Sequence, residues 1–319
     1  MKVLVTGSAG HLGEALMRVL RERGHDAVGL DLVRSPFTTD VGSIADAACV
    51  ARSLRGVEAV FHAATLHKPH VATHGRQIFI DTNVTGTLTL LEAAAATRVR
   101  AFVFTSTTSA FGDALVPPPG EPAAWITEEV RSVPKNIYGV TKAAAEDLCQ
   151  LFHRNQRLPC VVLRTSRFFP EEDDEPAVRA AFDDANLKTN EFLHRRVELE
   201  DVVEAHLLAA ERAPEIGFGR YIVSATTPFN YGDMAALRSD AAGLVRRLVP
   251  EHAAEYARRG WRMAAHIDRV YVNDKARRDL GWRPRHDFRS VVERLSRGGD
   301  LRSPLAQAVG SKGYHAVSG

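Results

Sequence analysis

Tyr138 and Lys142 are the residues of this sequence best suited to acid–base chemistry. They are four positions apart, so on a helix they lie on one face, one turn from each other. A tyrosine hydroxyl has an ordinary pKa of about 10 and is a poor base at neutral pH. A lysine ammonium group beside it would stabilise the phenolate and lower that pKa. The pair is therefore suited to acid–base chemistry, although Y-x-x-x-K by itself occurs by chance in many proteins.

A cluster of hydroxyl side chains precedes this pair. The apolar run 100–104 is typical of a buried strand, and the segment Thr105-Ser106-Thr107-Thr108-Ser109 follows it directly. In open α/β sheets, ligands bind at the carboxyl ends of the strands. We therefore expect these hydroxyls to face a ligand.

The element that must hold that ligand lies at the start of the chain. The apolar run 2–6 predicts a strand, Gly7, Gly10 and Gly13 follow it, and an amphipathic helical pattern begins at Leu12. In a dinucleotide-binding loop the first glycine permits the turn, the second admits the pyrophosphate, and the third lets helix and strand pack closely. The anion then binds the free N–H groups at the start of the helix.

A carboxylate stands where such a loop needs one. Asp31 ends the predicted strand 27–31, 18 residues after Gly13. There it would accept hydrogen bonds from ribose hydroxyls and repel a 2′-phosphate, which favours NAD over NADP. Arg34 is close by and weakens that preference.

Several short motifs occur together with these features and in a characteristic order. The chain carries TGSAGHLG with G-x-x-G-x-x-G spacing, His62-Ala63-Ala64, an N-V-x-G-T run at 83–87, Y-x-x-x-K at 138–142, D-V-x-x-A-H at 201–206 and L-G-W at 280–282. In this it resembles the extended short-chain dehydrogenase/reductase superfamily, and within it the NAD-dependent epimerase/dehydratase family. The resemblance covers residues 1 to about 290 and is most specific through residue 165.

The resemblance implies an α/β fold, a Rossmann-like doubly wound parallel sheet with a smaller C-terminal lobe. Residues 1–165 would form the NAD-binding domain that carries the tyrosine and the lysine. Residues 166–319 would be mainly a substrate-binding lobe, interleaved with the first domain.

The resemblance also assigns site residues. Tyr138 would remove or deliver the hydroxyl proton, Lys142 would tune it and bind the nicotinamide ribose, and Thr107 would orient the substrate oxygen. The expected cofactor-binding residues are Gly7, Gly10, His11, Leu12, Gly13, Asp31, Asp40, Val41, Ala63, Ala64, Asn83, Thr105, Tyr138 and Lys142. The expected substrate-binding residues are Ser106, Thr107, Thr108 and Arg167.

The implied reaction is hydride transfer between NAD and a carbinol or ketone carbon of a sugar or sugar derivative, by an epimerase or a dehydrogenase. Thr107 is followed by Thr108-Ser109 and not by the acid pair of the family's 4,6-dehydratases. Arg167 stands where many of its epimerases have asparagine, and the run 194–197 lacks their usual R-D-F-V. Two alternatives stay open, a reductase of a non-sugar carbonyl compound and an inactive NAD-binding regulatory protein. Intact Tyr138 and Lys142 argue against the second.

Composition sets further limits. The net charge is +2 without a basic block, so no nucleic-acid partner is indicated. Three cysteines without metal spacing favour a reducing cytoplasm, and no apolar run is long enough to span a membrane. The strand predicted from residue 2 leaves no room for a signal peptide. His67, His70 and His74 are interpreted as a polar loop over the site, so no metal is expected.

Two further expectations concern the outer surface. The helices predicted at about 84–97 and 137–153 are rich in alanine and leucine, and in related enzymes their counterparts pair across a two-fold axis. A homodimer is therefore expected. The last twenty residues are polar and are expected to be peripheral.

Overall fold

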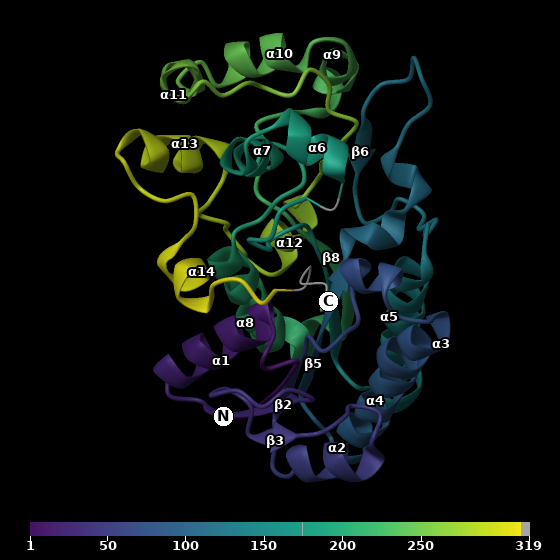
Figure 1. Ribbon diagram of the computed structural model, residues 1–319. Coiled ribbons are helices and arrows are strands. Elements are labelled where there is room, and N and C mark those ends of the chain that lie inside the picture. The colour runs from purple at the N-terminus through teal and green to yellow at the C-terminus, as the bar shows by residue number, and fades with distance from the viewer. Residues whose placement is uncertain (174, 314–319) are drawn as a thin grey trace.

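A seven-stranded parallel sheet forms the centre of the computed structural model, which describes residues 1–173 and 175–313 (Figure 1). Its strand order is β3-β2-β1-β4-β5-β7-β8. The strands are β1 Lys2–Thr6, β2 Asp26–Asp31, β3 Asp40–Val41, β4 Ala59–His62, β5 Ala101–Thr107, β7 Cys160–Thr165 and β8 Phe218–Val223. The order reverses between β1 and β4, and ligands bind at the carboxyl ends of the strands beside such a point. The expected Rossmann-like fold is confirmed.

Helices cover both faces of this sheet. On one face lie α1 (His11–Glu22) and α8 (Leu199–Ile216), and α14 (Pro304–Val309) packs on both of them. On the other face lie α2 (Ala47–Ser53), α4 (Gly86–Ala96) and α5 (Ile137–Gln156). Strands covered on both sides are apolar along most of their length, as in the fully buried run Cys160–Thr165.

A smaller lobe stands above the carboxyl edge of the sheet and has its own core (Figure 1). It holds a two-stranded parallel sheet, β6 Ala124–Ile126 with β9 Arg269–Tyr271. Its helices include α7 Asp184–Glu191, α9 Met234–Ser239, α10 Ala241–Leu248, α11 His252–Arg259 and α13 Phe288–Ser296. The remaining helices are α3 Arg76–Phe79, α6 Pro176–Ala181 and α12 Asp274–Asp279.

The chain crosses between the two parts more than once. Both α8 and β8 come after residue 165 and yet belong to the layers of the main sheet. Trp282 donates its indole N–H to the carbonyl of Asp201, and the Asp201 carboxylate accepts the backbone N–H groups of Arg285 and His286. The late L-G-W motif thus fastens the C-terminal part of the chain to α8.

The helix that carries Tyr138 and Lys142 is fixed at its start. The Asn136 side chain accepts the N–H of Gly139 at 3.0 Å and so caps α5. A π-helical stretch, Ile80–Thr85, precedes α4 and packs against α5. Within the described residues, no helix joins sufficient length to sufficient apolar character to cross a membrane.

Candidate active site

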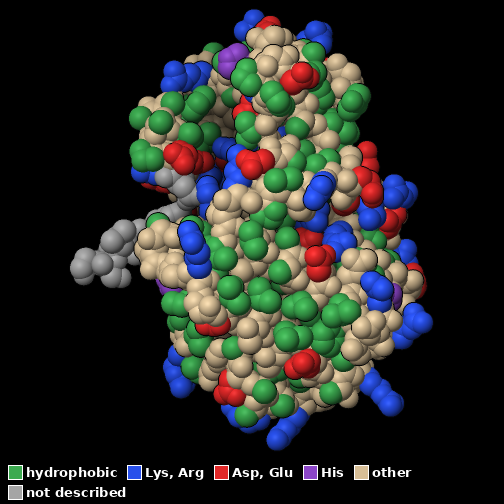
Figure 2. Space-filling view, turned by 90° about the vertical axis from the view of Figure 1, so that its right-hand side faces the viewer, with side chains coloured by type: hydrophobic (Ala, Val, Ile, Leu, Met, Phe, Trp, Pro, Cys, Tyr) green, Lys and Arg blue, Asp and Glu red, His purple; other side chains and the backbone are tan. Residues whose placement is uncertain are grey.

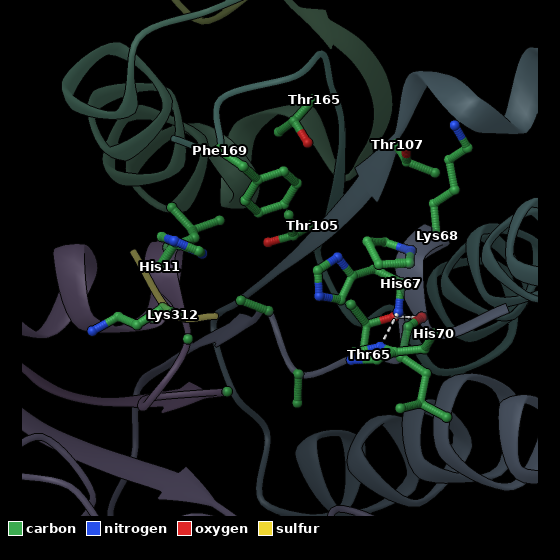
Figure 3. A pocket seen from close by; sticks show the side chains of 18 of the residues that line it. His11, Thr65, His67, Lys68, His70, Thr105, Thr107, Thr165, Phe169 and Lys312 are labelled. Carbon is green, nitrogen blue, oxygen red and sulfur yellow. Dashed lines mark hydrogen bonds between the residues drawn. The ribbon is translucent and has the colours of Figure 1, made fainter. Parts of the chain in front are cut away.

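A cavity of about 880 Å³ lies at the carboxyl edge of the sheet, below the smaller lobe. Its walls include the glycine-rich loop, the end of β2, the segment after β4 and the end of β5 with Tyr138. Arg195, Arg269 and Tyr271 line it from the smaller lobe. Figure 3 shows His11 and Lys312 on one side of this cavity and the segment His67–His70 on the other.

The glycine-rich loop has no space for side chains. The backbone of Gly7 has a φ of +74°, and a Cβ there would stand 2.7 Å from the amide nitrogen of Ala64. A Cβ on Gly13 would stand 1.8 Å from the carbonyl oxygen of Gly7. Gly10 is the N-cap of α1 and lines the cavity with His11 and Leu12. The loop therefore presents the backbone at the start of α1 to the cavity, as an anion site requires.

Asp31 lies beside this loop. Its carboxylate accepts the N–H of Ala9 at 3.0 Å and the N–H of Val33 at 2.9 Å, and the residue lines the cavity. These two bonds fix the carboxylate at the end of β2. It is thereby placed where the sequence predicted a ribose-binding acid.

The structure differs from expectation at the next strand. The Asp40 carboxylate accepts the hydroxyl of Ser53 on α2 at 2.6 Å, and Val41 is 47% exposed. The residues that line the cavity here are the following ones, Gly42, Ser43 and Ile44. The strand β3 is only two residues long, and the chain reaches the cavity wall directly after it, at Gly42.

Tyr138 meets Thr107 at the wall of the cavity. Burial raises the pKa of Tyr138 to about 12, and a hydrogen bond with the Thr107 side chain lowers that pKa in part. Thr107 ends β5 and also accepts the N–H of Ser109 at 3.1 Å. The structure thus brings together the tyrosine and the threonine that the sequence singled out.

Lys142 has a different environment from the one expected. Its ammonium group donates to the carbonyl of Thr105 at 2.6 Å and lies 4.0 Å from the centre of the Phe104 ring. Burial lowers the pKa of Lys142 to about 7, although the charge of Glu146 acts to raise it. In this structure the side chain that lowers the pKa of Tyr138 is Thr107 and not Lys142.

The hydroxyls around Thr107 point to different sides of β5. Thr105 hydrogen-bonds the imidazole of His206 on α8 at 2.8 Å, whereas Ser106 donates to the buried carboxylate of Glu146 on α5 at 2.5 Å. Although Ser106 lies along the cavity, its hydroxyl is therefore held by Glu146. Thr108 lines the cavity and is 7% exposed.

The segment after β4 is held from behind by Asn83. This side chain accepts the N–H of Leu66 at 2.8 Å and donates to the hydroxyl of Thr141 on α5 at 3.0 Å. Ala63 and Ala64 line the cavity at the start of the segment. Asn83 itself is 2% exposed and positions the segment that forms the wall.

Arg167 is engaged by acids from its own chain. Its guanidinium binds the carboxylate of Asp173 at 2.6 Å and the carbonyl of Glu172 at 2.8 Å. Arg195 lies 2.9 Å from the buried carboxylate of Glu191. Burial acts to raise the pKa of Glu191, but the neighbouring arginines outweigh burial and lower it. A substrate anion at Arg167 would therefore have to compete with Asp173.

The histidine loop lies along the cavity. His67, Lys68, His70 and His74 all line it, and His70 accepts the N–H of His67 at 3.1 Å. Figure 3 shows the Lys68 side chain extending toward Thr107. Among residues 1–173 and 175–313 no three histidine, cysteine or carboxylate side chains are grouped as metal ligands.

Some lining residues had no signal in the sequence. Lys312 lines the cavity near the glycine-rich loop, although it belongs to the C-terminal stretch that was expected to be peripheral. Arg269 comes from β9. Lys68 also lines the cavity, and its position in a polar, histidine-rich loop is a signal by which the sequence could have identified it.

The residues present fit a dinucleotide. The cavity joins a loop that excludes side chains, a helix start, a fixed carboxylate at a strand end and the Tyr138–Thr107 pair. Gly7, Gly10 and Leu12 would hold the diphosphate, Asp31 a ribose, and Thr107 with Tyr138 the reacting end.

Comparisons with known proteins agree with this geometry. The model of the NAD dependent epimerase/dehydratase family matches residues 3–223. A 3-beta-hydroxysteroid dehydrogenase of Mycolicibacterium neoaurum is 26% identical over 327 residues, covering 89% of this chain and 87% of that protein. A UDP-glucose 4-epimerase of Corynebacterium glutamicum is 28% identical over 333 residues, covering 92% and 94%. A short-chain dehydrogenase/reductase superfamily protein of Agrobacterium tumefaciens, solved with bound NAD, superposes with a TM-score of 0.65 at 23% identity, covering 93% of this chain and 98% of that one.

Proposed function

Because this chain belongs to the NAD-dependent epimerase/dehydratase family, we propose that it is an NAD-dependent epimerase or dehydrogenase acting on a carbinol or ketone carbon of a sugar or sugar derivative. The observation that carries the proposal is that Tyr138 and Thr107 lie together at the wall of the cavity that Asp31 and the glycine-rich loop also line. NAD, when bound, supplies the acceptor or donor of hydride.

The chain's own residues handle the proton. Tyr138 keeps its proton at neutral pH, since its ordinary pKa of about 10 is already well above 7 and burial raises that pKa further, to about 12. Thr107 both binds that hydroxyl and ends the strand that points at the cavity, so it can orient a substrate oxygen beside the tyrosine. A positioned proton donor or acceptor of this kind contributes about 10²–10⁴ in rate.

Asp31 supports NAD as the cofactor in preference to NADP. Its carboxylate is fixed by two backbone N–H groups and carries a negative charge where a 2′-phosphate would have to lie. The family's dependence on NAD agrees with this.

The substrate class follows from the relatives and from the far end of the cavity. A UDP-glucose 4-epimerase matches nearly the full length of this chain. Arg195 and Arg269 line the cavity beyond the Tyr138–Thr107 pair and are suited to an anionic or polyhydroxylated substrate. Thr108 follows Thr107 in place of an acid, which argues against a 4,6-dehydratase. Residues 1–165 would supply the cofactor site, and residues 166–319 most of the substrate lobe.

The test of function is turnover by the purified protein with NAD. We expect interconversion of UDP-glucose and UDP-galactose, or oxidation of a related sugar with formation of NADH. Tyr138→Phe is the control for background reactions, since it removes only the hydroxyl. Turnover of a 3β-hydroxysteroid without turnover of any sugar would favour a reductase of a non-sugar compound. Binding of NAD with no turnover of any carbinol would favour a regulatory protein.

A homodimer is part of this proposal. The face that carries α3, α4 and α5 gathers hydrophobic side chains in its lower half (Figure 2). Ile78, Val140 and Leu151 on these helices are 48%, 49% and 43% exposed.

Light scattering should give the mass of a dimer for the wild-type protein. The double variant Val140→Glu with Leu151→Glu should give the mass of a monomer. Val116→Glu, which charges an exposed valine of the loop after residue 112, is the matched control. A monomeric wild-type protein at micromolar concentration would exclude the proposal.

The three cysteines, Cys49, Cys149 and Cys160, are buried free thiols, which supports a reducing compartment such as the cytoplasm.

A further inference from the structure

The C-terminal segment reaches the first turn of α1. Ser303 fixes the start of α14, since its N–H donates to the buried Glu198 carboxylate at 3.0 Å and its hydroxyl caps the helix. After α14 the chain turns at Gly310, whose φ is +65°. Arg18 of α1 donates to the carbonyl of Ala308, so α14 ends beside α1.

Residues 311 and 312 are then tied to two carboxylates at the cavity. The Ser311 hydroxyl and the Lys312 N–H donate to the Glu171 carboxylate at 2.8 and 3.0 Å. The Lys312 ammonium group binds the Glu14 carboxylate at 2.5 Å. Lys312, Glu14 and Glu171 all line the cavity beside the glycine-rich loop.

These carboxylates lie where an anion is expected to bind. Glu14 is in the first turn of α1 and its side chain is 9% exposed. Burial acts to raise the pKa of Glu171, but hydrogen bonds and the charge of His11 outweigh it and lower the pKa to about 2, so Glu171 is ionised. Two buried negative charges at the start of a helix oppose a diphosphate there, because like charges repel strongly where water is excluded.

The groups that pair with these carboxylates come from both ends of the chain. His11 Nε2 lies 3.1 Å from the Glu171 carboxylate, and Arg18 lies 2.7 Å from the Glu14 carboxylate. Lys312 is the contribution of the C-terminal segment, and Figure 3 shows it on the same side of the pocket as His11.

We propose that residues 310–313 form part of the dinucleotide site and that Lys312 supports binding of the diphosphate by neutralising the Glu14 carboxylate at the start of α1. The inference rests on the proposed function in one respect, that the ligand is NAD. Its alternative is that the segment only fastens α14 to α1, in which case Lys312 would affect stability and not NAD binding.

Titration calorimetry with NAD separates these two roles. We expect Lys312→Met to weaken NAD binding about fivefold at low ionic strength, the effect of one partly screened charge contact. The difference should shrink as salt is added, because salt screens partly exposed charges. Lys312→Arg should bind like the wild type. Arg297→Met, which removes an exposed cation paired with Glu293 on α13, is the matched control and should change nothing.

A second substitution tests the charge argument itself. If Lys312 acts by neutralising Glu14, then Glu14→Gln in the Lys312→Met protein should restore most of the lost affinity. A chain that ends after Val309 keeps α14 and should bind NAD at least as weakly as Lys312→Met. Thermal unfolding without NAD should be nearly unchanged in Lys312→Met.

Two results would overturn the inference. One is a Lys312→Met protein that binds NAD as tightly as the wild type, and the other is a double variant with no recovery. A wild-type protein that binds NAD and turns over no sugar would leave the inference standing and overturn the proposed activity alone. Failure of the wild-type protein to bind NAD would overturn both.

Discussion

Replacing Lys142 by methionine is expected to stabilise the protein at neutral pH in the absence of NAD, while it weakens NAD binding. Burial holds the pKa of Lys142 at about 7, against 10.5 for the free side chain. This difference in pKa lowers the free energy of unfolding of the wild type by about 5 kcal/mol at low pH, because the unfolded chain binds a proton at Lys142 more tightly than the folded chain does. Methionine has a similar length, carries no charge, and gives up the hydrogen bond to the Thr105 carbonyl, worth about 1 kcal/mol, together with the contact of the ammonium group with the Phe104 ring. The expected net gain at pH 7 is therefore about 3–4 kcal/mol.

The pH dependence of the free energy of unfolding follows from the lowered pKa of Lys142. Between pH 7 and 10.5 the unfolded chain binds more protons at Lys142 than the folded chain, so the wild-type free energy of unfolding rises with pH across this window. Lys142→Met lacks that contribution. The variant should be more stable than the wild type at pH 7, and the difference should disappear or reverse by about pH 10.5.

Denaturant unfolding of the two proteins without NAD, at several values between pH 7 and 10.5, measures the difference directly. Calorimetry with NAD supplies the second readout. Lys142→Met should bind NAD more weakly, because it removes the group expected to bind the nicotinamide ribose. Lys275→Met is the control for loss of a lysine, since Lys275 lies in α12 and its ammonium group is over the ring of Tyr221 in β8. If the wild type and Lys142→Met showed the same dependence of stability on pH, the assignment of a depressed pKa to Lys142 would be refuted.

Three further predictions concern the remaining site residues. Tyr138→Phe should lower turnover at least about 10²-fold in steady-state assays, with NAD affinity and thermal stability nearly unchanged, and retention of more than about a tenth of the turnover would contradict the role of the hydroxyl. Thr107→Ala removes the hydrogen bond that lowers the pKa of Tyr138, so the pH profile of turnover should move to higher pH while NAD affinity changes little; an unmoved profile would count against Thr107. Asp31→Ala should narrow the preference for NAD over NADP in calorimetric titrations, and an unchanged ratio of affinities would show that Asp31 does not set it.

The features that the sequence predicted well are those set by local spacing. The glycine positions, Asp31 and the Tyr138–Lys142 pair each depend on a few neighbouring residues and one turn or helix. The structure places the glycines, Asp31 and Tyr138 at one cavity, whereas Lys142 is buried behind Tyr138 and donates to the Thr105 carbonyl. The orientation of Ser106 was also open to prediction, because side chains alternate along a strand and Thr105 and Thr107 share a face that Ser106 does not.

Other parts of the site depend on contacts between distant segments. The turn of the chain after Val41 is set by β3 and by the packing of α2, so the wall residues Gly42–Ile44 had no local signal. The pairing of Arg167 with Asp173 requires the fold of the loop between them. Glu14 and Lys312 are 298 positions apart, and no periodicity or motif relates them.

The packing of α14 on α1 also bears on the order in which the protein is completed during synthesis. Arg18 and Ala308, which meet at this contact, are 290 positions apart. At about 5–20 residues per second, ribosomal translation needs roughly 15–60 seconds to make the chain between them. The side of α1 that α14 covers stays uncovered for that time. This wall of the cavity therefore forms only after residues 304–313 have been made, long after the glycine-rich loop that lines the same cavity.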